Sequence, residues 1–167
     1  MSAIITGTGS TLPIKLVKNA DFLDHEFYDK NGKKSDKPVA EIIAKLEAIT
    51  GIRERRYVPD HEDSVPLMAS AAAKAVADAG LQVNDLQGII VAHNAGNMLT
   101  GGKGINSVPN LAALLKHALK VENYDCFAFD ILFGCPGWVQ EVPSVFYNLK
   151  PLFPLLLHTP FKESPRF

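Results

Sequence analysis

The chain has 167 residues, 47% hydrophobic and 21% charged, a composition that is ordinary for a globular protein with one core. Its net charge of −1 at pH 7 provides no basic field to hold a phosphate backbone, so no nucleic-acid partner is expected. The first residues lack a signal-peptide pattern and no apolar run approaches membrane-spanning length, so we expect a cytoplasmic protein with no membrane partner.

The first thirty residues predict a strand and an exposed turn. Residues 3–6 form a short apolar run that predicts a strand ending at Gly7 and Gly9. A Gly-x-Gly after a strand can bind phosphate, but the third glycine of a dinucleotide-binding motif is missing, so a structural turn is favoured. Asn31-Gly32 predicts an exposed loop or short hairpin.

Two helices and a buried strand are predicted next. Apolar residues recur at helical spacing from Pro38 until Gly51 ends the pattern. A second, alanine-rich helix is predicted to begin at Ser64 and to end at Gly80. Residues 86–92 then read as a continuous apolar strand, which is typical of a parallel strand buried on both faces.

Polar residues follow the carboxyl end of that strand, where ligands bind in open α/β sheets. A catalytic role for His93 is the less favoured interpretation, because a lone histidine there is more often a hydrogen-bonded structural residue. The segment Gly101–Gly104 predicts a mobile loop, since it lacks phosphate-loop spacing. Asn110 precedes a third predicted helix, with His117 on its polar flank.

The last predicted strand leads into a cysteine. Residues 126–132 are too short for a helix and predict a central, buried strand. Gly134 and Gly137 bracket a tight turn, and Pro136 suits a first helical position. Cys135 therefore falls at or beside a helix N-cap, where the dipole and free amides favour the nucleophilic thiolate. The alternative is that Cys135 is only a small buried hydrophobic residue.

The stretch from 129 to 138, with its Gly134-Cys135-Pro136-Gly137 core, resembles the nucleophile loop of the thiolase-like condensing enzymes, in particular β-ketoacyl-ACP synthase III. The resemblance covers residues 3–140. Further segments are similar to that family in the same order, namely residues 4–9, 49–57, 63–64, 88–92, 108–112 and 128–130. The alternation of strands and helices independently predicts an α/β fold with a mixed or mostly parallel sheet.

The resemblance implies the N-terminal half of a thiolase-like layered αβαβα fold in residues 1–140. It also implies decarboxylative Claisen condensation, in which Cys135 accepts an acyl group and malonyl-ACP then attacks the acyl-enzyme. Acyl-CoA or acyl-ACP would be the donor, with no permanently bound cofactor and no metal. Acyl carrier protein is the implied partner. Family members are homodimers, with the segment Gly101–Asn110 near the partner subunit.

The chain departs from the family in two ways. The family's catalytic histidine and asparagine lie beyond the matched region, so we expect this chain alone to be inactive in condensation. The tryptophan and arginine that hold coenzyme A fall at Lys45 and Ile49, which weakens acetyl-CoA as primer. Arg53 and Arg56 remain candidates for the rim of the pantetheine tunnel.

Residues 141–167 do not match the family and read as an irregular tail. Prolines are spaced too closely there for a helix to persist. We therefore predict that a frameshift or a truncated gene changes the sequence after about residue 140. The prolines of this tail are Pro143, Pro151, Pro154, Pro160 and Pro165.

Two other functions compete with condensation. The chain could be a non-enzymatic remnant, or an interaction module that pairs through a sheet edge or its leucine-rich tail. A thiol redox protein that uses Cys126 and Cys135 is the weaker alternative, because their spacing is not Cys-x-x-Cys and matches neither a disulfide framework nor a metal site.

Overall fold

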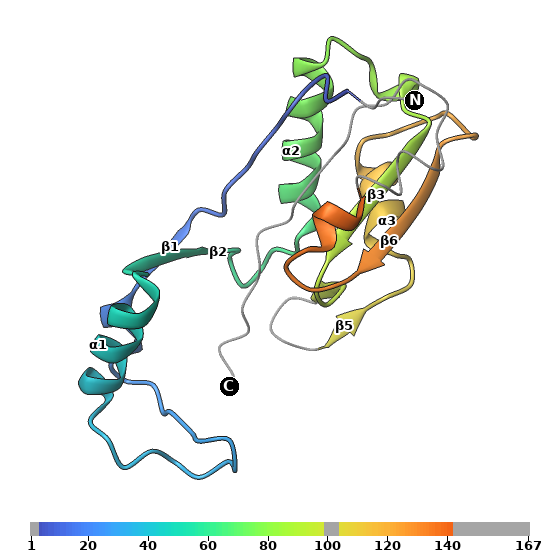
Figure 1. Cartoon of the computed structure of the whole chain (residues 1–167). Helices are drawn as coiled ribbons and strands as arrows, with labels where there is room; N and C mark the ends of the chain where they lie inside the picture. Colours follow the sequence, from blue (N-terminus) through green and yellow to red (C-terminus); the bar gives the residue numbers. More distant parts are fainter. Residues whose placement is uncertain (1–3, 99–103, 142–167) are drawn as a thin grey trace. The chain divides into compact units, whose positions relative to one another are not determined.

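A computed structural model describes residues 4–98 and 104–141 of the chain. They fall into two compact units, which are described separately (Figure 1). One unit comprises residues 13–59, and the other comprises residues 4–12 together with the described residues from 60 to 141. The proline-rich tail predicted from residue 141 lies outside the described residues, except for Glu141 itself.

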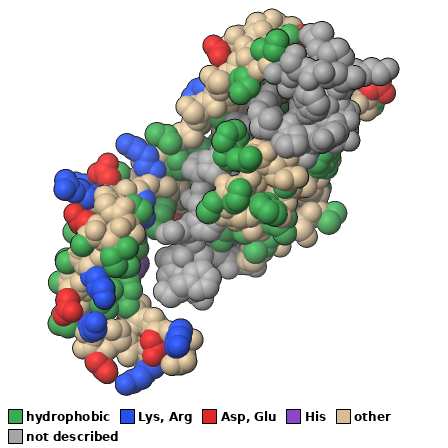
Figure 2. Space-filling model, in the orientation of Figure 1, with side chains coloured by type: hydrophobic (Ala, Val, Ile, Leu, Met, Phe, Trp, Pro, Cys, Tyr) green, Lys and Arg blue, Asp and Glu red, His purple; other side chains and the backbone are tan. Residues whose placement is uncertain are grey.

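The unit of residues 13–59 is a small antiparallel ribbon with one long helix. Strands β1 (Lys15–Lys18) and β2 (Glu54–Tyr57) pair antiparallel, and the 3-10 helix η1 (Asn19–Phe22) follows β1. Helix α1 (Val39–Thr50) is the predicted amphipathic helix, and Gly51 ends it in the left-handed conformation at φ 69°. None of the α1 residues is buried. Charged side chains of both signs are interspersed over the surface of this unit (Figure 2).

The predicted Asn-Gly turn of this unit is confirmed. Gly32 has φ 75°, and an isolated bridge joins Tyr28 to Lys34 across the turn. The Asp29 side chain accepts hydrogen bonds from the amides of Asn31 and Lys33, at 2.8 and 2.9 Å. These bonds satisfy turn amides that no strand partner reaches.

The second unit is built on a parallel βαβ motif. Strand β3 (Gly88–His93) pairs in parallel with β6 (Phe127–Leu132), and helix α3 (Leu111–Ala118) connects them. Helix α2 (Val65–Asp78) precedes β3 and is followed by the short 3-10 helix η2 (Val83–Asp85). A small hairpin of β4 (Asn97–Met98) and β5 (Ile105–Asn106) lies between β3 and α3. The α/β class predicted from the sequence is confirmed, including the parallel pairing.

The core of this unit lies between one face of the sheet and helices α2 and α3 (Figure 1). Leu111 and Leu115 of α3 meet Met68 of α2 over Ile89 and Val91 of β3. Burying such side chains stabilises a domain by about 1.5–3 kcal/mol each. The apolar spacing that predicted α2 and α3 is therefore the spacing of their buried faces.

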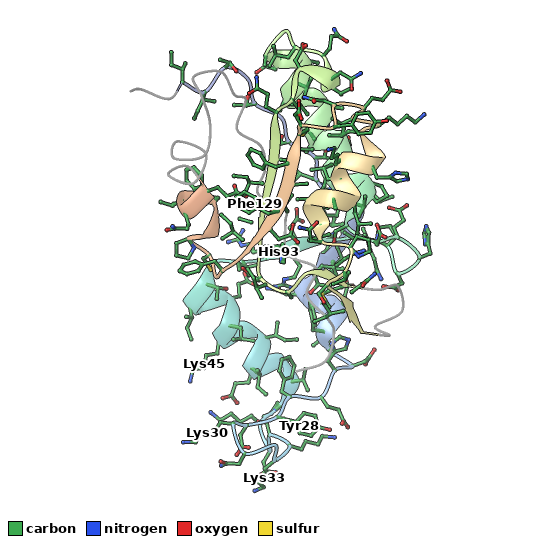
Figure 3. All side chains as sticks on the ribbon, turned by 90° about the vertical axis from the view of Figure 1, so that its right-hand side faces the viewer. Tyr28, Lys30, Lys33, Lys45, His93 and Phe129 are labelled. Atoms are coloured by element: carbon green, nitrogen blue, oxygen red, sulfur yellow. The ribbon has the colours of Figure 1, made fainter. Side chains whose placement is uncertain are left out.

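The opposite face of the sheet carries aromatic residues. Phe127 and Phe129 stack with ring centroids 5.7 Å apart, and Phe129 lies on the side of β6 away from α3 (Figure 3). Gly88 makes room for the Phe127 ring, because a Cβ there would come within 2.2 Å of it. The described start of one more helix, residues 137–141, lies against Ala92 on this face. The sheet thus has helices on both faces.

Three local predictions were wrong. Residues 4–6 form no strand, and Gly7 and Gly9 do not make a turn. This segment instead lies along α2, where a Cβ on Gly7 would come within 2.5 Å of the Ala75 oxygen and one on Gly9 within 2.2 Å of the Ala71 oxygen. Strand β6 is partly exposed rather than buried, and within the described sheet it pairs with β3 alone.

The boundaries of α2 and α3 follow local capping chemistry. Ser64 occupies the N-cap of α2 as predicted, but its side chain makes no cap hydrogen bond. The Asp63 carboxylate accepts from the Val65 amide instead, at 2.9 Å. Asn110 caps α3 by accepting from the Ala113 amide at 2.9 Å. Gly80 ends α2 at φ 69°, as predicted.

Candidate active site around Cys135

Cys135 lies in a tight turn at the carboxyl end of β6. The Gly137 amide donates to the Gly134 oxygen at 2.8 Å and closes this segment, the Cys135 turn (residues 134–137). The first helical hydrogen bond follows, from the Gln140 amide to the Pro136 oxygen at 3.2 Å. The helical residues thus begin at Gly137, one position later than predicted. Cys135 is an exposed free thiol beside this helix start, so its interpretation as a buried hydrophobic residue is wrong.

Gly137 allows the new helix to lie directly on β3. A Cβ at Gly137 would come within 3.2 Å of the Ala92 Cβ, closer than most real side-chain contacts. Any larger residue would push the helix, and the Cys135 turn with it, away from the sheet. The close approach that the glycine permits therefore sets how near the start of this helix lies to β3.

Glu141 lies one helical turn after Gly137 and is buried. It is only 2% exposed, and its Oε1 has no hydrogen-bond partner among the residues that the structure describes. Burial raises the pKa of this carboxyl to about 8, and the backbone of Ala92 offsets part of the effect. No pattern in the sequence placed Glu141 in the helix, because the predicted irregular tail begins at that residue.

His93 lies at the carboxyl end of β3 (Figure 3), and two hydrogen bonds hold its ring there. Its Nε2 lies 2.9 Å from Asp130 Oδ2, and its Nδ1 accepts from the Gly96 amide at 2.8 Å. Both ring nitrogens are therefore occupied by partners within the fold. This arrangement supports the structural interpretation of His93 and leaves the ring no free nitrogen to act as a base toward Cys135.

Asp130 connects β6 to helix α3. Its Oδ2 accepts from the Leu111 amide and its Oδ1 from the Ala112 amide, each at 2.8 Å. Amides at a helix N-terminus have no partner within the helix, so the carboxylate both satisfies them and complements the helix dipole. Asp130 belongs to the family-like segment 128–130, but no role was predicted for it from the sequence. Its signal was a lone carboxylate inside an apolar strand.

Exposed apolar side chains flank Cys135 along the chain and make up its apolar rim. Leu132 is 66% exposed, Phe133 52%, Trp138 48% and Val139 52%. Figure 2 shows hydrophobic side chains at the visible surface of this unit. Such a rim suits an apolar substrate chain or a covering protein surface.

No cluster in residues 4–98 and 104–141 contains three metal-ligating side chains close enough to hold an ion. None of the helices in these ranges combines the length and the apolar character needed to traverse a bilayer.

Arg53 and Arg56, the candidates for the tunnel rim, lie in the other unit. Arg53 is 85% exposed at its side chain and pairs with Glu47 at 3.4 Å, and Arg56 is exposed on β2. Arg55 is the packed arginine, donating to Asn19 at 3.0 Å and lying 4.9 Å from the Phe22 ring centroid. Both arginines belong to the unit of residues 13–59, and their role at the tunnel rim stays a prediction.

Lys45, Ile49 and Cys126 lie away from the Cys135 turn in the chain. Lys45 points outward from α1 (Figure 3), and Ile49 is 70% exposed. Cys126 is buried at 3% exposure, and burial raises the pKa of its thiol. It precedes β6 whereas Cys135 follows it, so roughly 20 Å of strand separates them. A disulfide needs Cα atoms within about 7 Å, and the redox-pair hypothesis is wrong for this fold.

No protein-family model matches the chain. Curated relatives include the β-ketoacyl-[acyl-carrier-protein] synthase III of Neisseria gonorrhoeae, 34% identical over 148 residues, which covers 89% of this chain and 39% of the relative. The protein of the same name from Staphylococcus aureus is 32% identical over 145 residues, covering 85% of this chain and 38% of the relative. The chain therefore spans about two-fifths of the length of these relatives.

Solved structures agree with the sequence comparison. The 3-oxoacyl-[acyl-carrier-protein] synthase III of Aquifex aeolicus matches with a TM-score of 0.61 at 27% identity, over 87% of this chain and 41% of that one. The β-ketoacyl-[acyl-carrier-protein] synthase III of Thermus thermophilus matches with a TM-score of 0.62 at 25% identity, over 87% and 38%. The chain is thus homologous to the N-terminal part of the β-ketoacyl-[acyl-carrier-protein] synthase III proteins and shares their thiolase-like fold.

Proposed function

We propose that Cys135 is the nucleophile that accepts an acyl group in a β-ketoacyl-ACP synthase III-type condensation. The observation that carries the proposal is the exposed Cys135 thiol, in a glycine-bracketed turn after β6, in a chain homologous to proteins of that name. The thiolate would attack the thioester carbonyl, form the acyl-enzyme and release the donor's thiol. The Cys135 amide is available as one donor to the developing oxyanion.

The second stage would use malonyl-ACP. Loss of CO₂ leaves a carbanion equivalent that attacks the acyl-Cys135 carbonyl, releasing β-ketoacyl-ACP and regenerating the thiolate. The resemblance assigns the histidine and asparagine for this stage to the region beyond residue 140. We therefore propose that condensation in fatty-acid biosynthesis belongs to a homodimeric protein of the relatives' length, with acyl carrier protein as its partner.

The acyl donor is proposed to be acyl-CoA or acyl-ACP, with no permanently bound cofactor. The apolar rim formed by Leu132, Phe133, Trp138 and Val139 supports an acyl chain longer than acetyl. Arg53 and Arg56 are proposed contacts for the phosphate or pantetheine of the donor, since guanidinium groups bind phosphate well. Lys45 and Ile49 argue against the usual adenine clamp for coenzyme A.

Acylation tests this proposal directly. The protein is incubated with hexanoyl-CoA or hexanoyl-ACP, and the peptide that contains residue 135 is examined by mass spectrometry. We expect a hexanoyl adduct on Cys135 that is lost in Cys135→Ala and kept in Cys126→Ala. If neither donor modifies Cys135 in protein that is folded by NMR, the nucleophile assignment is wrong.

The competing function is a non-enzymatic interaction module, which the exposed apolar rim around Cys135 also supports. We expect no β-ketoacyl product from the 167-residue chain when malonyl-ACP is added, because the second-stage groups are assigned to the region beyond the match. Acylation without condensation supports the proposal. Formation of the β-ketoacyl product would show that this chain supplies the second stage as well.

A further inference from the structure

We infer that His93 and Asp130 form a latch that positions the Cys135 turn, with His93 acting as a positioning residue. The latch consists of His93, Asp130 and the Gly96 amide, joined by the bonds of 2.9 and 2.8 Å described above. Its consequence for catalysis rests on the proposed function of Cys135. Its structural part stands on the geometry alone.

The hydrogen bonds fix the protonation of the ring. Because the Gly96 amide donates to Nδ1, that nitrogen presents a lone pair, and the proton of the neutral imidazole lies on Nε2. The Nε2–H then donates to Asp130 Oδ2. The two side chains are 8% and 16% exposed, so water competes little for these bonds.

His93 also holds the segment that precedes Cys135 through its backbone. The His93 oxygen accepts from the Phe133 amide at 3.0 Å, and His93 pairs with Leu132 at the last position of the β3–β6 register. The His93 side chain therefore contacts Asp130 and its backbone contacts Phe133, two positions in the stretch that leads to Cys135. Only Phe133 and Gly134 separate that last pair from the thiol.

Asp130 ties the latch to the core. Its carboxylate accepts from the Leu111 and Ala112 amides, and both residues are buried against α2 and β3. The position of the His93 ring is thus set by a packed helix terminus rather than by a loop. Removing the ring would take away its bond to Asp130 and so loosen the end of β6, and with it the Cys135 turn, while the backbone pairing stays and α3 remains capped.

The test compares substitutions of His93 that each keep a different one of its two side-chain hydrogen bonds. The His93→Gln side chain can still donate to Asp130, as Nε2 does, but does not replace Nδ1. The His93→Asn side chain can still accept from Gly96 but does not reach Asp130. His93→Ala removes both bonds. His117→Ala is the matched control, because His117 is an exposed histidine on α3.

Amide hydrogen exchange at Gly96, Phe133 and Gly137 is the readout. In His93→Ala we expect exchange at Phe133 and Gly137 to accelerate about tenfold, the factor expected for loss of one hydrogen bond. His93→Gln should accelerate Gly96 alone, whereas His93→Asn should accelerate Phe133 and Gly137. His117→Ala should change none of them. The latch is overturned if the amides of Phe133 and Gly137 exchange within about twofold of the wild-type rate in both His93→Asn and His93→Ala.

The wild-type protein provides a test that needs no variant. Nitrogen-15 NMR of the His93 ring should show a protonated Nε2 and an unprotonated Nδ1, and the opposite tautomer overturns the inference. None of these measurements uses an acyl donor. Failure of Cys135 acylation with the exchange pattern intact would therefore refute the proposed function and keep the latch. Normal acylation of Cys135, with exchange unchanged in His93→Asn and His93→Ala, would instead refute the latch and keep the proposed function.

Discussion

Glu141→Gln should remove a large pH-dependent penalty from folding. The pKa of the buried Glu141 carboxyl rises from its ordinary 4.5 to about 8, because burial without a partner for Oε1 disfavours the charged form. At 1.36 kcal/mol per pKa unit, this rise corresponds to about 3–5 kcal/mol between the protonated and ionised folded states. That range is comparable to the net stability of a small domain.

The sign follows from proton linkage. Between pH 4.5 and about 8 the folded protein binds more protons at Glu141 than the unfolded chain does. The free energy of unfolding therefore falls as pH rises through this interval and levels off above it. Glutamine has nearly the same shape and no charge, so Glu141→Gln should be the more stable protein at high pH and should lose this pH dependence.

Urea unfolding at about pH 5 and about pH 8.5 measures the effect. We expect wild type to lose about 3–5 kcal/mol between the two conditions and Glu141→Gln to lose much less. Glu122→Gln, at an exposed glutamate, is the control and should follow wild type. Parallel curves for wild type and Glu141→Gln would refute the burial argument.

Three further substitutions test the capping and packing. Lys120→Gly should raise the free energy of unfolding by about 1 kcal/mol in urea titrations, because Lys120 adopts the left-handed conformation (φ 56°) at the end of α3. Glycine adopts this conformation without strain, and Gly80 occupies the corresponding position after α2. Asp130→Ala should lower the free energy of unfolding by about 3 kcal/mol, since two helix amides and the His93 ring lose their acceptor. A loss below about 1 kcal/mol would contradict the role of Asp130 in connecting β6, α3 and His93. Gly137→Val should slow Cys135 alkylation or acylation by displacing the helix from Ala92, and unchanged rates would show that the close approach is dispensable.

Local patterns predicted the helices well. Apolar spacing within short windows predicted helices α1, α2 and α3. Their boundaries depend on local capping, with Asn110 before α3, Gly51 after α1 and Gly80 after α2. The parallel pairing of β3 and β6 followed from two apolar runs separated by a helix. The Cys135 turn followed from its glycines and proline.

Features that depend on distant partners were not predictable in this way. The apolar pattern of residues 4–6 predicted a strand, but Ile4 and Ile5 are exposed, and the chain that follows them packs closely on α2 at Gly7 and Gly9. The role of Asp130 arises from residues 18 and 19 positions away in the chain, and a pattern within one strand does not reveal them. Burial of Glu141 likewise involves a residue distant in the chain, because its carboxyl lies beside the Ala92 backbone of β3.

The contact between the N-terminal segment and α2 has a consequence for the order of folding. The Thr8 amide donates to Asp78 across 70 positions of sequence, so this contact closes a long loop. The β3–α3–β6 motif closes over much shorter separations and should form first. We expect residues 4–12 to dock last and to open most readily by local unfolding, while the Cys135 turn belongs to the early, more persistent part of the molecule.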